Sequence, residues 1–139
     1  MLYRKAYDKL LEWKNQTKRK ALCILGARQI GKTTVIRQFG NDHYECFVEI
    51  NFITDADAGK IFAGNLDANT IITNLTAYTR KPMIPGKTLV LLDEIQACPN
   101  ARTAIKFLVE DSRFDYIESG SLLGVKHKEV RSYPVGFEE

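Results

Sequence analysis

The residues best suited to do chemistry form a glycine-rich segment, Gly26, Ala27, Arg28, Gln29, Ile30, Gly31, Lys32 and Thr33, followed by Thr34. It satisfies G-x-x-x-x-G-K-[ST], a phosphate-binding pattern when it lies between a strand and a helix. Glycines let the backbone amides form a nest around phosphate oxygens, and the helix N-terminus adds partial positive charge. Lys32 can then bridge β- and γ-phosphates, and the Thr33 hydroxyl can ligate Mg²⁺. The alternative is a strand-to-helix turn that only resembles the motif.

An acidic pair, Asp93 and Glu94, directly follows the apolar run of residues 89–92, and Asp93 lies 61 residues after Lys32. In open α/β sheets the carboxyl ends of the strands carry the ligand, at the same edge as a phosphate loop. We therefore expect Asp93 to hold Mg²⁺ and Glu94 to orient and polarise the attacking water. The alternative is that both carboxylates only stabilise the following helix through its dipole. GTP is disfavoured because the sequence has Asp93-Glu-Ile-Gln instead of D-x-x-G, and no N-K-x-D.

Further polar residues are candidates for the same site. Ser119 and Ser121 flank Gly120 at the end of a predicted strand, where one hydroxyl could sense the γ-phosphate, although Ser-Gly-Ser is also common in turns. Asn51 ends another predicted strand and could hydrogen-bond Glu94. A charge-neutralising arginine could be Arg102, Arg113 or Arg131, and the spacing selects none of them.

The elements that must position these residues alternate along the chain. Apolar spacing and glycine or proline punctuation predict helices over 3–14, 30–39, 56–63, 68–78 and 101–110, with Gly40 as the stop of the second. They predict strands over 21–25, 45–51, 88–92, 114–118 and 129–133. Strands that alternate with helices indicate an α/β fold with a mostly parallel sheet covered on both faces.

Length and composition suit one ordinary globular domain over residues 1–139. The chain is 45% hydrophobic and 27% charged, with a net charge of +3. No apolar run approaches a membrane span and no export signal is visible, so we expect a cytoplasmic protein without membrane contact. Three cysteines without a C-x-x-C pair suggest buried thiols. Residues 1–20 carry seven basic and two acidic side chains on a predicted amphipathic helix, which supports nucleic-acid binding only weakly.

The motifs together resemble the ATPase domain of a prokaryotic AAA-type family of predicted ATPases. The resemblance is carried by residues 26–34, 91–96, 119–123 and 133–137. It implies a three-layer P-loop NTPase fold with a five-stranded sheet of order 5-1-4-3-2. It also implies Mg-ATP binding by Lys32 and Thr33, metal coordination by Asp93, water activation by Glu94, and a sensor at Ser119 or Ser121. Relatives continue into a helical lid and a C-terminal domain, which we expect to be absent here.

Three functions follow as hypotheses. The first is a Mg²⁺-dependent P-loop ATPase core that hydrolyses the β–γ bond and couples hydrolysis to movement of a partner or a second domain. The expected assembly is a homo-oligomer or a complex with a partner protein. The second is a nucleotide-binding interaction module that holds ATP or ADP without significant turnover, consistent with a missing lid. The third is a DNA-binding adaptor that rests on the basic residues 1–20 alone.

Overall fold

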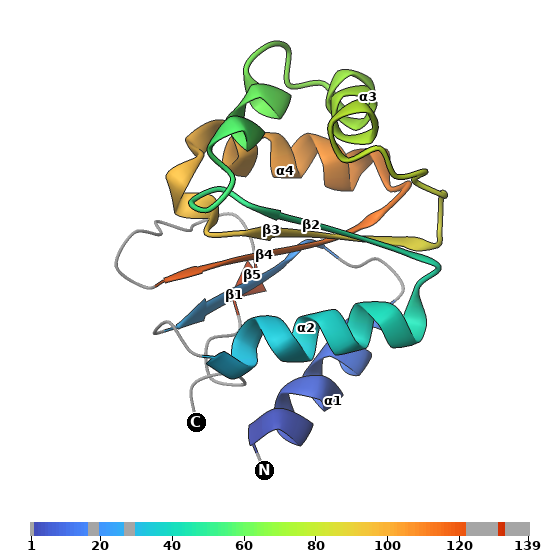
Figure 1. Ribbon diagram of the computed structural model, residues 1–139. Helices are drawn as coiled ribbons and strands as arrows, with labels where there is room; N and C mark the ends of the chain where they lie inside the picture. Colours follow the sequence, from blue (N-terminus) through green and yellow to red (C-terminus); the bar gives the residue numbers. More distant parts are fainter. Residues whose placement is uncertain (1, 17–19, 27–29, 122–130, 133–139) are drawn as a thin grey trace.

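The protein is described by a computed structural model that places residues 2–16, 20–26, 30–121 and 131–132 (Figure 1). Its α-helices are α1 (Leu2–Lys14), α2 (Ile30–His43), α3 (Ala68–Thr79) and α4 (Pro99–Asp111). Two 3-10 helices are η1 (Ala56–Phe62) and η2 (Ile95–Ala97). The strands are β1 (Leu22–Gly26), β2 (Cys46–Asn51), β3 (Thr88–Asp93), β4 (Asp115–Ser121) and β5 (Arg131–Ser132).

One parallel sheet organises the fold, and its body consists of four strands in the order β1-β4-β3-β2. This is the P-loop-like α/β arrangement expected from the alternating elements. At the far side of β1, β5 adds a short parallel pairing at Leu22 and Cys23. The strand expected over 129–133 is thus represented by two residues, because the positions around them lie outside the described residues.

Helices cover both faces of the sheet, and each face has its own core. In Figure 1, α1 and α2 lie below the sheet, while α3, α4 and the 3-10 helices lie above it. Every residue of β3 is buried, with Leu89 and Leu91 in the α1/α2 core and Val90 and Leu92 in the α3/α4 core. A continuous apolar run is what a parallel strand buried on both faces requires.

Helix α2 continues through Gly40 to His43, so the expected stop at that glycine was wrong. Gly40 is needed for packing, because a Cβ atom there would lie 2.5 Å from Cδ1 of the Phe47 ring on β2. The missing side chain lets the helix approach the strand closely. The helix expected over 56–63 is also different, since η1 is a 3-10 helix that includes Gly59, a residue that weakens α-helices.

Strand β4 also runs further than expected. Ser119, Gly120 and Ser121 continue the strand instead of ending it, and they pair with Ile24, Leu25 and Gly26 of β1. The ladder with β1 supplies backbone partners that no single segment reveals, and it overrides the turn preference of these small residues. This extension places the Ser-Gly-Ser segment beside the end of β1, the strand that leads into the glycine-rich segment.

The basic amphipathic helix α1 packs its apolar face on α2. Ala6, Leu10 and Trp13 are buried, and the Trp13 indole Nε1 donates a hydrogen bond of 2.7 Å to the Lys20 carbonyl. Within the described residues, no helix has the length and apolar character that a membrane crossing requires.

Candidate functional site

The predicted site residues of three neighbouring strands meet at the carboxyl edge of the sheet. Asp93 ends β3, and Ser119 lies near the end of β4. The hydroxyl of Ser119 donates a hydrogen bond of 2.7 Å to Oδ1 of Asp93, and both side chains are buried. The sequence separation of 26 residues gave no hint of this contact, which follows from the parallel pairing of β3 with β4.

Lys32 reaches the same edge from the first turn of α2. Its Nζ donates a hydrogen bond of 3.2 Å to the carbonyl of Gly120, and the side chain is 8% exposed. Within the part of the chain that the structure describes, its partner is therefore a neutral carbonyl, not a carboxylate. A buried ammonium group without an ion pair is costly unless an anion can reach it, which suits a phosphate ligand.

Asp93 is held by neutral donors on both carboxylate oxygens. Oδ1 also accepts the backbone N–H of Glu94 at 2.9 Å, and Oδ2 lies 3.4 Å from Nδ2 of Asn51. The expected hydrogen bond from Asn51 to Glu94 was wrong. Asn51 lies opposite Asp93 in the β2–β3 register, so its amide contacts Asp93 while its carbonyl accepts two backbone N–H groups of the following turn.

Glu94 has a left-handed backbone, with φ 55° and ψ 46°. The other two non-glycine residues described with positive φ, Arg80 and Ser112, are helix C-caps, where this conformation is common. Glu94 instead stands between a strand and η2, where the conformation costs about 1 kcal/mol or more. Its Oε1 accepts a hydrogen bond of 2.8 Å from Nε2 of Gln96. Sequence reasoning missed the role of Gln96.

A second buried carboxylate, Glu118, lies on the other face of the sheet and was also missed. It is 0% exposed, and Oε1 accepts a hydrogen bond of 3.0 Å from Nη1 of Arg102 on α4. Oε2 has no hydrogen-bond partner among the described residues. Burial raises the pKa of Glu118 to about 7, and the nearby Arg102 opposes that rise. The signal was a glutamate inside an apolar strand, which calls for a buried partner.

The side chains of two of the three candidate arginines are described, and both bind residues away from the proposed site. Arg102 is bound to Glu118, and Arg113 pairs with Asp111 at 2.8 Å and reaches Asn69. The side chain of Arg131 lies outside the described residues. Neither described arginine contacts the cluster of Lys32, Asp93 and Ser119, because both are engaged elsewhere.

The glycine-rich segment itself is described in part. Gly26 ends β1, Ile30 and Gly31 begin α2, and the side chain of Thr33 is half-buried on the first turn while that of Thr34 is exposed. Ala27, Arg28 and Gln29, and the side chain of Ser121, lie outside the described residues. The strand-loop-helix context that the motif requires is therefore present.

An oxygen donor set for Mg²⁺ can be assembled from this edge. Asp93 supplies a buried carboxylate whose Oδ2 has a weak 3.4 Å contact, and Thr33 supplies a hydroxyl. Carboxylate and hydroxyl oxygens, completed by water and phosphate oxygens, are the ligands that Mg²⁺ takes in nucleotide sites. The residues present fit that ion.

A solved structure shares this fold at low sequence identity. The Orc1 protein of Aeropyrum pernix, solved in complex with DNA, matches with a TM-score of 0.51 and 16% identity, over 88% of this chain and 38% of that chain. C. elegans PCH-2 matches with a TM-score of 0.48 and 19% identity, over 91% of this chain and 36% of that one. The chain thus spans less than two fifths of either protein. No curated protein matches the sequence.

The sequence itself places the chain in a family. Residues 18–138 match the family described as AAA domain, which leaves residues 1–17 and 139 outside the match. The matched range contains the glycine-rich segment, the acidic pair and the Ser-Gly-Ser strand end. The chain therefore belongs to this family of AAA domains, whose ligand is a nucleotide.

Proposed function

We propose that this chain is the core of a Mg²⁺-dependent ATPase that binds ATP at the carboxyl edge of its sheet and hydrolyses the β–γ phosphate bond. One observation carries the proposal. The Lys32 ammonium, the Asp93 carboxylate and the Ser119 hydroxyl converge from α2, β3 and β4 on one buried polar cluster next to the glycine-rich segment. Buried polar clusters at this edge of an open α/β sheet are typical of ligand sites.

Each residue has a role that its position supports. Lys32 can exchange the Gly120 carbonyl for β- and γ-phosphate oxygens, which are stronger partners for an ammonium group. Backbone amides of residues 26–34 would bind the phosphates, and Thr33 with Asp93 would hold the Mg²⁺. When bound, the metal neutralises the charge that develops on the phosphate oxygens.

Glu94 is the proposed residue that orients and polarises the attacking water. It directly follows the proposed metal ligand, and its left-handed backbone is the kind of local strain that concentrates at functional sites. Ser119 and Ser121 are the proposed contacts toward the γ-phosphate, since both lie at the end of the strand beside β1. We also propose that β5 is the outer strand of a five-stranded sheet of order 5-1-4-3-2.

A nucleotide-binding module without significant turnover is the second candidate. The hydrogen bond from Gln96 to the Glu94 carboxylate favours this candidate, because it competes with the proposed orientation of the attacking water.

ATP affinity and phosphate release from the wild type, Lys32→Ala and Glu94→Gln variants test the proposal. We expect Lys32→Ala to weaken ATP binding at least tenfold, about 1.4 kcal/mol, because it removes the buried ammonium. Glu94→Gln should keep ATP binding and lose phosphate release. Lys60→Ala, on the exposed side of η1, is the matched control and should change neither.

The outcomes separate the two candidates. Binding without phosphate release in the wild type would favour the module, and release that survives Glu94→Gln would remove that residue from the mechanism. If Lys32→Ala binds ATP as well as the wild type, the proposed site is wrong.

A further inference from the structure

Strand β2 forms one end of the described sheet, with β3 on its inner side. Peptide groups of successive residues in a strand point to opposite sides, so those of Phe47 and Glu49 point away from β3. The carbonyl of Phe47 accepts a hydrogen bond of 3.0 Å from Nζ of Lys81, which lies beyond the end of α3. An exposed edge of this kind is a template for another strand, and an edge lysine is a common protection against unwanted pairing.

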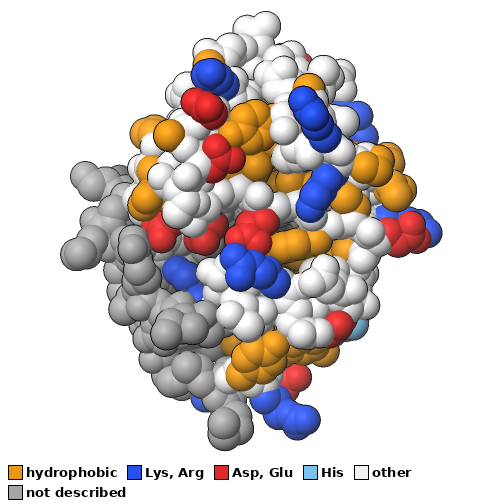
Figure 2. Space-filling model, in the orientation of Figure 1, with side chains coloured by type: hydrophobic (Ala, Val, Ile, Leu, Met, Phe, Trp, Pro, Cys, Tyr) orange, Lys and Arg blue, Asp and Glu red, His pale blue; other side chains and the backbone are white. Residues whose placement is uncertain are grey.

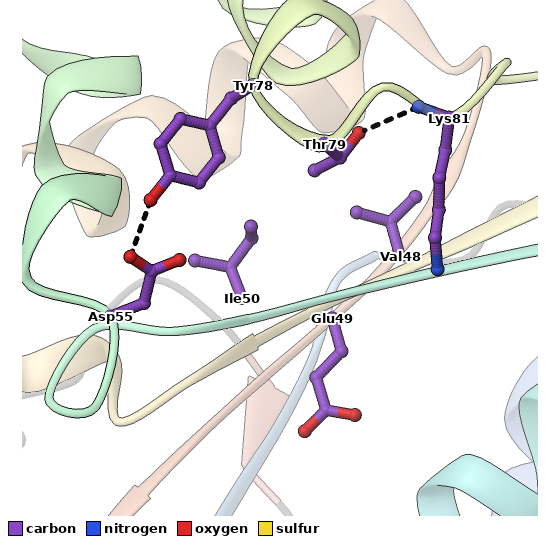
Figure 3. A pocket seen from close by; sticks show the side chains of 7 residues that line it. All are labelled: Val48, Glu49, Ile50, Asp55, Tyr78, Thr79 and Lys81. Carbon is purple, nitrogen blue, oxygen red and sulfur yellow. Dashed lines mark hydrogen bonds between the residues drawn. The ribbon is translucent and has the colours of Figure 1, made fainter.

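A groove runs between this edge and α3. Figure 3 shows Val48 and Ile50 of β2 on one side, and Tyr78 and Thr79 of α3 on the other. The cavity has a volume of about 270 Å³. Hydrophobic, acidic and basic side chains lie next to one another on the face of the molecule shown in Figure 2. A groove between an edge strand and a helix can receive the side chains of an added strand on alternate positions.

The two ends of the groove carry opposite charges. Lys81 lies at the beginning of β2, where it contacts Phe47, and Asp55 lies just beyond the end of β2 (Figure 3). The Tyr78 hydroxyl donates a hydrogen bond of 2.5 Å to Oδ1 of Asp55. This hydrogen bond, together with desolvation, raises the pKa of Tyr78 to about 12, so the phenol remains a neutral donor to Asp55.

We propose that this groove binds an extended peptide segment of a partner protein as an antiparallel strand on β2, with a basic residue near Asp55 and an acidic residue near Lys81. The charges place the acidic residue of the peptide at the beginning of β2, and in an antiparallel strand the basic residue therefore comes first in the peptide sequence. Parallel sheets commonly carry one antiparallel strand at an edge. On binding, Lys81 releases the Phe47 carbonyl to a peptide amide and pairs with the acidic side chain.

A second copy of the chain fits this edge less well. Its β2 carries its own α3 on the same face of the sheet, and Tyr78 and Thr79 show that this helix borders the groove. In an edge-to-edge pair the two helices would compete for the space that the side chains of a single added strand can fill. A peptide without a covering helix avoids this conflict.

Two charge-swapped peptides test the proposal on the full chain without nucleotide, which keeps the result independent of the proposed ATPase activity. The probes are acetyl-Lys-Thr-Val-Thr-Val-Thr-Asp-amide and acetyl-Asp-Thr-Val-Thr-Val-Thr-Lys-amide, with binding measured by isothermal titration calorimetry. We expect the first to bind about twofold to fivefold more tightly, as a partly exposed ion pair allows. Lys81→Glu should abolish the preference, because each peptide then has one favourable and one unfavourable end, while Lys106→Glu, on the exposed side of α4, should leave it unchanged.

Backbone methylation tests strand addition itself. N-methylation of the alternate peptide amides that face β2 should abolish binding, while methylation of the amides that face away should preserve it. Equal binding of the two charge-swapped peptides, equal effects of the two methylation patterns, or no binding of either peptide would overturn the proposal. A dimer in sedimentation that Lys81→Glu dissociates would also overturn it, because the occupant would then be a second copy.

Discussion

Two buried carboxylates on neighbouring strands face opposite sides of the sheet and are stabilised in different ways. Asp93 of β3 is 5% exposed and contacts a hydroxyl, a backbone amide and a side-chain amide. Glu118 of β4 is 0% exposed and contacts the Arg102 guanidinium through one oxygen. The first carboxylate has neutral donors, and the second has a positive charge beside it.

This difference makes Asp93 suited to bind a ligand and Glu118 suited to stabilise the fold. Neutral donors stabilise the charge of Asp93 without cancelling it, so the carboxylate retains its attraction for a cation. The charge of Glu118 is already compensated by Arg102, and a buried pair of this kind ties α4 to β4. Burial alone therefore does not distinguish the two carboxylates; the charge of their hydrogen-bond partners does.

The largest expected effect comes from removing the charge beside Glu118. Arg102→Leu should lower the free energy of unfolding by about 3–5 kcal/mol above pH 8, because it leaves a buried carboxylate uncompensated. Urea denaturation measures this loss. The double variant Arg102→Leu with Glu118→Leu should recover most of it, and a loss under about 1 kcal/mol in the single variant would contradict the buried pair.

The second-largest expected effect is the dependence of the free energy of unfolding on pH that Glu118 causes. Its folded pKa of about 7 lies above the ordinary 4.5, so the folded state binds an extra proton between these values. This stabilisation is fully present below pH 4.5 and is lost as the pH rises through about 7. Glu118→Gln should remove this fall in the free energy of unfolding, which amounts to at most roughly 3 kcal/mol.

Urea denaturation of the wild type and Glu118→Gln across this pH range measures the difference. Asp42, Asp67 and Asp111 have pKa values lowered by hydrogen bonds and act in the opposite direction in both proteins, so they cancel in the comparison. Parallel stability curves for the two proteins would show that Glu118 has an ordinary pKa.

On the opposite face of the sheet from Glu118, Asp93→Asn should change ligand binding rather than stability. The amide can still accept the Ser119 hydrogen bond but loses the negative charge, so the Mg²⁺-dependent part of ATP affinity should fall about tenfold, about 1.4 kcal/mol. Calorimetric ATP titrations with and without Mg²⁺ measure this. Glu118→Gln, below pH 7, is the control that should keep the Mg²⁺ effect, and an unchanged Mg²⁺ effect in Asp93→Asn would exclude Asp93 as a metal ligand.

The smallest expected effect comes from Ser119→Ala. It removes the 2.7 Å hydrogen bond to Asp93 and should reduce the free energy of unfolding by about 1 kcal/mol, the usual value for one hydrogen bond. Thermal or urea denaturation is the measurement, and Thr103→Ala on the exposed side of α4 is the control. Equal stability of both variants would show that other donors replace the serine.

Much of the fold could be predicted because local patterns agree with it. The apolar run before Asp93 predicts a buried strand, and β3 is buried at every position. The spacing in residues 3–14 predicts an amphipathic helix, and α1 buries its apolar side against α2. The glycine-rich segment lies between β1 and α2, as its motif requires.

The errors came where a distant contact outweighed a local preference. Gly40 suggests a helix end, yet the Phe47 ring needs the space of its missing side chain. Ser119 to Ser121 suggest a turn, yet β1 pairs with them. Arg102 was one of three candidates for a charge-neutralising arginine, and only the fold showed that it pairs with Glu118.

The sequence by itself determined the order of the elements, the family and the residue types of the site, because periodicity and motif spacing are local properties. Only the tertiary structure decided which carboxylate has which partner. Strand register brings Ser119 and Asn51 to Asp93, and the alternation of side chains across the sheet sends Glu118 to Arg102 on the other face. Two acids that look alike in the sequence therefore differ because parallel pairing places one among neutral donors and the other beside a guanidinium group.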